Sequence, residues 1–109
     1  MSAMELAIAT NSPVFVDVTA DWCITCTVNK ISVLELDTIN KAFADAEFML
    51  FQADWTRPND EIAEFLAMNG RFGIPFDIIF SPRLETPIIL PEILTAERLL
   101  DAIQAASLK

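Results

Sequence analysis

The chain has 109 residues, of which 53% are hydrophobic and 21% charged, and its formal net charge is −9. This length and apolar content are sufficient for one folded domain and exclude intrinsic disorder. The acidic balance argues against nucleic-acid binding, which needs a basic surface. No apolar run approaches the roughly 18 residues of a membrane-spanning helix. The first ten residues contain Glu5 and neither Lys nor Arg, so they do not resemble a signal peptide.

Strand-like and helix-like segments alternate along the chain. In chain order, the sequence predicts a short helix over 4–9, a strand over 14–19, a helix from about Cys23, a helical piece over 37–43, a strand over 47–53, a helix from Pro58 to Asn69–Gly70, strands over 76–80 and 87–90, and a last helix after Thr95. This order predicts an α/β sandwich in which helices flank a central mixed β-sheet.

Several local patterns refine these elements. The strand over 14–19 is rich in β-branched residues and reads as buried. Ile24, Val28 and Ile31 are spaced for one face of a helix. The continuous apolar run 48–51 suits a strand in the centre of a sheet.

Capping residues and apolar stripes define the two later helices. The run 59–61 (Asn-Asp-Glu) offers capping groups and early negative charge, and Thr95 is placed to cap the last helix. The expected inner stripes are Ile62, Phe65 and Leu66 in the first of these helices, and Leu99, Leu100 and Ile103 in the second.

The two cysteines, Cys23 and Cys26, lie three residues apart where the first strand passes into a helix. This spacing allows their sulfurs to cycle between a dithiol and a disulfide. Unpaired N–H groups at a helix N-terminus favour a negative sulfur, so we expect a lowered pKa and nucleophilic character for Cys23. Cys26, one turn deeper, is expected to be shielded and to act as the resolving thiol.

Other interpretations of the two cysteines remain open. The chain has no histidine, so a zinc or iron–sulfur site would have only two cysteine ligands, whereas such sites require about four. A structural disulfide is possible, although so short a loop constrains the unfolded chain little. Two inert buried cysteines are the third alternative.

The wider segment 14–26, which reads VFVDVTADWCITC, resembles the active site of the thioredoxin superfamily. In detail it is similar to the C-terminal periplasmic domain of the thiol:disulfide interchange protein DsbD family. The segment 53–56 (ADWT) resembles a second stretch of those relatives, and the likeness runs from about Val14 to Gln104. The resemblance implies a thioredoxin-like fold and a protein-disulfide reductase.

The resemblance also implies roles for individual residues. Asp17 occupies the position of a buried carboxyl group; burial without a cation favours the protonated form, and such a group could take the proton from Cys26. An Asp17 that reaches solvent is the alternative. Ile74–Pro75 resembles the cis-proline loop, which would offer the Ile74 backbone to an extended partner chain. An ordinary trans turn is the alternative here.

Three aromatic side chains lie near this predicted site. Trp22 is expected to flank the sulfur, or only to pack. Phe72 is expected to form an apolar rim for partner docking. For Phe76, core packing is the preferred interpretation.

The sequence also departs from the family pattern. Thr27 stands where many relatives have Lys, and Lys30 stands where the DsbD domain has a carboxylate. Both differences change the charges near the cysteines and therefore affect the pKa expected for Cys23.

Taken with the resemblance, these residues predict a single thioredoxin-like domain over 1–109 that belongs to a longer inner-membrane protein. It would act as a monomer in the periplasm, including in cytochrome c biogenesis. It would take electrons from a membrane-embedded donor domain and pass them to oxidised protein thiols through the Cys23–Cys26 disulfide, without metal or organic cofactor. A stand-alone cytoplasmic reductase and a binding module with a structural disulfide are the alternatives.

Overall fold

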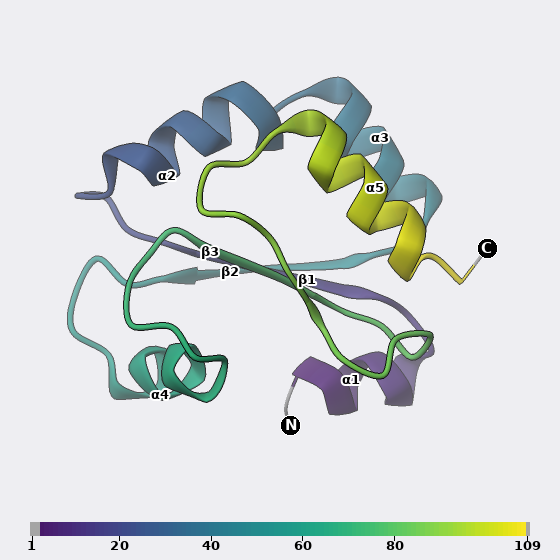
Figure 1. Ribbon diagram of the computed structural model, residues 1–109, viewed down its shortest axis with the longest axis horizontal. Coiled ribbons are helices and arrows are strands. Elements are labelled where there is room, and N and C mark those ends of the chain that lie inside the picture. The colour runs from purple at the N-terminus through teal and green to yellow at the C-terminus, as the bar shows by residue number, and fades with distance from the viewer. Residues whose placement is uncertain (1–2, 109) are drawn as a thin grey trace.

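The computed structural model describes residues 3–108 and places one β-sheet between two layers of helices. Figure 1 shows α2, α3 and α5 on one face of the sheet and α1 and α4 on the other. The elements in chain order are α1 (Ala3–Thr10), β1 (Val14–Thr19), α2 (Ile24–Asn29), the π-helix η1 (Lys30–Leu34), α3 (Asp37–Asp45), β2 (Met49–Asp54), α4 (Asp60–Met68), β3 (Phe76–Phe80), β4 (Ile88–Ile89) and α5 (Ala96–Ala106). No helix within the described residues is long and apolar enough to span a membrane.

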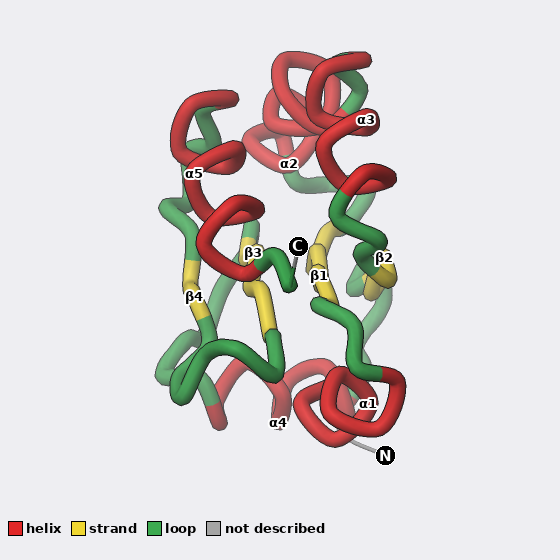
Figure 2. The backbone as a smooth tube through the Cα atoms, turned by 90° about the vertical axis from the view of Figure 1, so that its right-hand side faces the viewer, coloured by secondary structure: helices red, strands yellow, loops and turns green. Residues whose placement is uncertain are grey.

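The sheet has the strand order β2-β1-β3-β4, which Figure 2 shows side by side. Strands β1 and β2 are parallel, whereas β3 runs antiparallel to β1 and to β4. The chain therefore has the predicted thioredoxin-like architecture, a central mixed sheet flanked by helices.

Strand β2 lies at an edge of the sheet, so the prediction of a central position was wrong. Leu50 is 52% exposed and Phe51 is 44% exposed. A continuous apolar run cannot distinguish an edge strand from a central one, because that difference depends on which strands pair with it.

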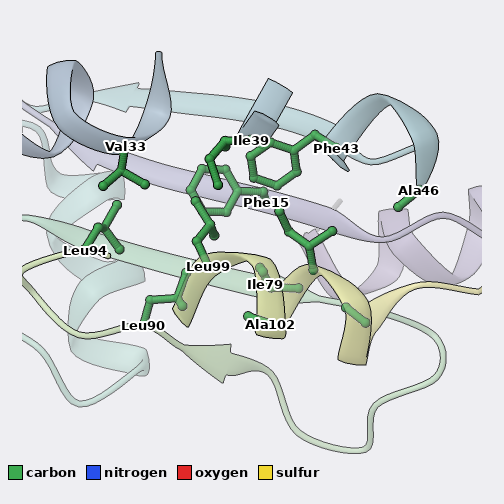
Figure 3. Packing of buried hydrophobic residues seen from close by; sticks show 12 residues of the cluster. Phe15, Val33, Ile39, Phe43, Ala46, Ile79, Leu90, Leu94, Leu99 and Ala102 are labelled. Atoms are coloured by element: carbon green, nitrogen blue, oxygen red, sulfur yellow. The ribbon is translucent and has the colours of Figure 1, made fainter. Parts of the chain in front are cut away.

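Alternate residues of β1 and β3 face the two helical layers. On the side of α3 and α5, Phe15 and Ile79 are register partners in the cluster that Figure 3 shows. On the side of α1 and α4, Phe76 joins the second cluster with Val16 and Leu66, which confirms its predicted core role.

Two of the predicted helix caps are confirmed. The Ile62 N–H donates to the Asn59 side chain (3.1 Å), and the Arg98 N–H donates to the Thr95 hydroxyl (3.3 Å). Gly70 follows α4 with a φ of 74°, a conformation that favours glycine.

Two predicted inner faces differ from the structure. Ile24, Val28 and Ile31 are exposed by 81%, 51% and 63%, so the apolar stripe of the helix after Cys23 points outward. The buried face of this segment carries Cys26, Asn29 and Val33 instead. In α5, Leu99 and Ile103 are buried as predicted, but Leu100 is 36% exposed.

Candidate redox site

Cys23 and Cys26 form a disulfide at the start of α2. Cys23 is the N-cap residue of this helix, with extended backbone angles (φ −91°, ψ 102°). The backbone N–H of Cys26 donates to the Cys23 sulfur over 3.2 Å. The sulfur of Cys23 therefore sits where an unpaired helical N–H group can stabilise negative charge.

Both sulfurs lie in a small apolar cluster. Cys23 is 7% exposed and Cys26 is 6% exposed, with Ala20 and Ile74 packed beside them. We expected Cys23 to be reachable and Cys26 to be shielded, but the two residues are almost equally buried when the disulfide is closed. What separates the two cysteines is position, because only Cys23 is the helix cap.

Cys26 also borders a polar hollow of about 220 Å³ between α2 and the end of β2. Thr19, Lys30 and Asp54 line this hollow. Lys30 therefore contributes a positive charge on the Cys26 side of the site. Among the described residues, no group of three or more Cys, Asp or Glu side chains is arranged to hold a metal ion.

The loop before β3 approaches the disulfide. The Ile74–Pro75 peptide bond is cis, as the family resemblance implies, and the Ile74 side chain packs against the cysteine cluster. Pro75 is buried, whereas Phe72 is 85% exposed. Because β3 begins at Phe76, the backbone of Ile74 lies outside the sheet.

Thr56 holds the turn before Cys23 through two hydrogen bonds. The Trp22 indole N–H donates to the Thr56 carbonyl (3.2 Å), and the Asp21 N–H donates to the Thr56 hydroxyl (2.9 Å). The Thr56 hydroxyl and its backbone N–H donate in turn to Asp54 and lower the pKa of that carboxyl group. Trp22 itself is 59% exposed. The sequence had marked 53–56 as a family-like segment, but it gave no sign that Thr56 fastens this turn.

Asn29 holds α2 from the other side. It is 3% exposed, and its side-chain amide donates to the Glu92 carbonyl (2.8 Å) and accepts from the Leu94 N–H (3.1 Å). Arg71 forms an ion pair with Glu92 at 3.6 Å, which links the same loop to the segment before Pro75. Sequence analysis missed Asn29, because a polar residue in a short amphipathic helix normally indicates a solvent-facing position.

Asp17 lies on β1 and is half-buried rather than fully buried. Its register partner across the sheet is Asp77 on β3, which is 1% exposed. Neither carboxyl oxygen of Asp77 has a hydrogen-bond partner among the described residues. Burial, and then the interaction with the Asp17 carboxyl, raise the pKa of Asp77 to about 9. The sequence analysis missed Asp77, although it is the one charged residue in the otherwise apolar run 76–80.

The fold, the CxxC disulfide at a helix N-terminus and the adjacent Pro75 loop define a thioredoxin-like protein. The thioredoxin-like family model matches residues 1–82, and the chain belongs to this family. Together the family, the fold and the disulfide identify the chain as a thiol–disulfide oxidoreductase that acts on protein thiols and disulfides. No curated protein sequence matches the chain.

Solved structures extend this comparison. The C-terminal domain of DsbD from Neisseria meningitidis is 26% identical, and the match covers 95% of this chain and 90% of that one. Its TM-score is 0.75 for the reduced form and 0.76 for the oxidised form. A thioredoxin from Thermus thermophilus has 19% identity and a TM-score of 0.70, with 94% of this chain and 78% of that chain covered; it shows the common fold.

Proposed function

We propose that this chain is the electron-delivering domain of a periplasmic thiol:disulfide interchange system. It would accept electrons from a membrane-embedded donor domain and pass them to oxidised periplasmic thiol proteins, with the Cys23–Cys26 pair as the only electron carrier. The observation that carries the proposal is the disulfide at the N-terminus of α2, within a chain of which 95% matches a DsbD C-terminal domain.

The chemistry proceeds by two thiol–disulfide exchanges. In the reduced domain the Cys23 thiolate attacks one sulfur of a partner disulfide; the other partner sulfur leaves as a thiolate and takes a proton from solvent. Cys26 then loses its proton and attacks the Cys23 sulfur, which releases the second partner thiolate and closes the Cys23–Cys26 bond. Two electrons pass to the partner, which becomes a dithiol. Loading from the donor dithiol runs these steps in reverse.

The surface around the disulfide supports docking of a partner protein. Trp22 and Phe72 are exposed aromatic side chains, the first in the turn before α2 and the second in the loop before Pro75. The Ile74 backbone, outside the sheet and next to the disulfide, is available for strand-like pairing with an extended partner segment.

Trapping tests the order of the two cysteines. The reduced Cys26→Ala variant should accumulate a mixed disulfide with an oxidised protein substrate, visible on a non-reducing gel and sensitive to dithiothreitol. The Cys23→Ala variant is the matched control and should trap little. Equal trapping by both variants would show that the assigned roles are wrong.

The identity of the electron donor tests the periplasmic placement. The oxidised domain should be reduced rapidly by the membrane domain of a DsbD-type protein in detergent, and slowly by thioredoxin reductase with NADPH. The opposite preference would favour a stand-alone cytoplasmic reductase. Resistance of the disulfide to both donors and to dithiothreitol would instead indicate a structural disulfide.

A further inference from the structure

Strand β2 leaves one edge of the sheet open. Its residues, Met49–Asp54, pair with β1 on one side, and on the other side Figure 2 shows no further element of the described chain. Proteins usually protect such an edge with proline, lysine, a bulge or a very short strand, because unpaired backbone groups invite pairing with another chain. The strand, which reads MLFQAD, contains neither proline nor a basic residue, and its register with β1 is uninterrupted.

The opposite edge of the sheet is protected. Strand β4 has only 2 residues, Ile88–Ile89, and it lies between Pro87 and Pro91. A strand so short, flanked by residues without a backbone N–H, offers little to an incoming chain. Of the two edges, only β2 therefore provides a pairing surface as long as an ordinary strand.

The hydrogen bonds to β1 determine which backbone groups of β2 face the open side. The Met49 N–H donates to the Pro13 carbonyl (2.9 Å), and the Trp55 N–H donates to the Thr19 carbonyl (2.7 Å). Successive residues of a strand direct their N–H and C=O groups to opposite sides, so the odd-numbered residues of β2 face β1. The outward-facing residues are Leu50, Gln52 and Asp54.

Apolar side chains flank the open edge on both faces of the sheet. Leu50, opposite Phe15, is 52% exposed on the α3 side, and Phe51, opposite Val16, is 44% exposed on the other. A hollow of about 180 Å³ is lined by Leu50 together with Phe15 and Phe43. A strand added at this edge would remove apolar surface from water on both faces, which favours its binding.

The charges of the chain favour a second copy as the added strand. The chain carries 16 acidic residues and a formal net charge of −9, but the run 48–53 contains no charged residue. Two copies with this net charge repel each other. They can therefore approach with least repulsion where both present an uncharged segment, and β2 is such a segment in each copy.

We propose that the β2 edges of two copies of this chain pair antiparallel across a twofold axis and form one continuous sheet. Gln52 then faces Gln52 of the second copy, and Leu50 faces Asp54, so every outward-facing backbone group of the strand meets a partner. Phe51 lies opposite Ala53, which places a large side chain beside a small one twice in the dimer. The one charged residue of the strand, Asp54, faces an apolar side chain rather than a like charge.

Sedimentation equilibrium of the oxidised protein tests the association. The mass should rise with concentration from 12.1 kDa to twice that value. The dimer should become more stable as salt is added, because salt screens the repulsion between two acidic chains. A mass of one chain up to millimolar concentration, which is the monomer that the sequence predicts, would overturn the proposal.

Two lysine variants with the same change in charge locate the interface. Phe51→Lys places a charge on the open edge and should raise the dissociation constant of the dimer about tenfold or more, because the contact with Ala53 is lost twice. Met68→Lys alters an 84% exposed side chain of α4 and should leave the dimer unchanged. Circular dichroism shows that each variant is folded. Equal effects of the two variants would overturn the β2 interface.

Single-cysteine variants test the register. In a background of Cys23→Ala and Cys26→Ala, Gln52→Cys should form a linked dimer on mild oxidation, because opposed residues of a hydrogen-bonded pair have Cα atoms about 5.5 Å apart, within reach of a disulfide. Leu50→Cys is the matched control on the same strand; it lies away from the axis and should link far less. Failure of Gln52→Cys to link, or equal linking by both variants, would overturn the pairing. None of these readouts uses thiol–disulfide exchange by the Cys23–Cys26 pair, so their outcome is independent of the proposed function.

Discussion

Replacing Asp77 by Asn should change how the stability of the oxidised protein depends on pH. The pKa of Asp77 is raised from 3.8 to about 9 in the folded chain, first by burial and then by Asp17. Between these two values the folded state binds a proton that the unfolded state has lost. Stability therefore falls as pH rises through this window, and the contribution is complete only below the unfolded pKa.

The magnitude follows from the same two values. Each pH unit above 3.8 costs about 1.4 kcal/mol, so Asp77 lowers the free energy of unfolding at pH 7 by at most about 4 kcal/mol relative to acid pH. An amide at this site has no charge to desolvate but leaves buried polar atoms unpaired, which costs about 1–3 kcal/mol. We expect Asp77→Asn to be more stable than wild type at pH 7 by about 1–3 kcal/mol, and no more stable at pH 4.

Urea unfolding of the oxidised proteins at pH 4, 5, 6, 7 and 8 measures this difference, with the disulfide closed so that neither cysteine titrates. Repulsion among the acidic side chains also grows with pH, but it is nearly the same in both proteins and cancels in the comparison. Parallel stability curves for wild type and Asp77→Asn would refute the reasoning, because Asp77 would then ionise alike in the folded and unfolded states.

Three further predictions concern the site. Asn29→Ala removes two buried hydrogen bonds to the 92–94 loop and should lower the free energy of unfolding by about 2–3 kcal/mol in urea. Phe72→Ser should leave stability within about 0.5 kcal/mol, since the ring is 85% exposed, yet reduce the rate of mixed-disulfide formation with a protein substrate. In the reduced protein, Cys23 should be alkylated by iodoacetamide faster than Cys26 at pH 7, by mass spectrometry of quenched samples, because it caps α2.

Each of these predictions has a matched control. Asn40→Ala removes an exposed amide that bonds to nearby carbonyls and should cost less than about 1 kcal/mol; an equal loss would mean that the anchoring role of Asn29 is misjudged. Met68→Ser removes an equally exposed apolar side chain of α4 and should leave trapping unchanged. Equal alkylation rates for the two cysteines would remove the basis for their separate roles.

Features with local causes were predictable from the sequence. The bounds of β1 and β3, and the caps Asn59 and Thr95, depend on residues within a few positions of each other. The disulfide and its place at a helix start follow in the same way from the strand–CxxC–helix pattern.

Features set by distant neighbours were not predictable in this way. The apolar run in β2 indicated a strand but not its edge position, which results from pairing with β1 alone. Ile24, Val28 and Ile31 have the spacing of a buried face, but the sheet lies on the opposite side of the helix. Asp77 was missed in the sequence although it is a charge within an apolar strand, and only the register revealed that Asp17 lies opposite.

The contacts that the sequence did not reveal hold the chain in place on both sides of the Cys23–Cys26 pair. Thr56 holds Trp22 and the turn before Cys23, and Asn29 holds α2 after Cys26. Each of these contacts joins the side chain of Trp22, Thr56 or Asn29 to a main-chain group, and none involves a sulfur atom. We therefore expect these contacts to persist when the disulfide opens and to keep the two sulfurs close enough for Cys26 to resolve a mixed disulfide before the partner dissociates.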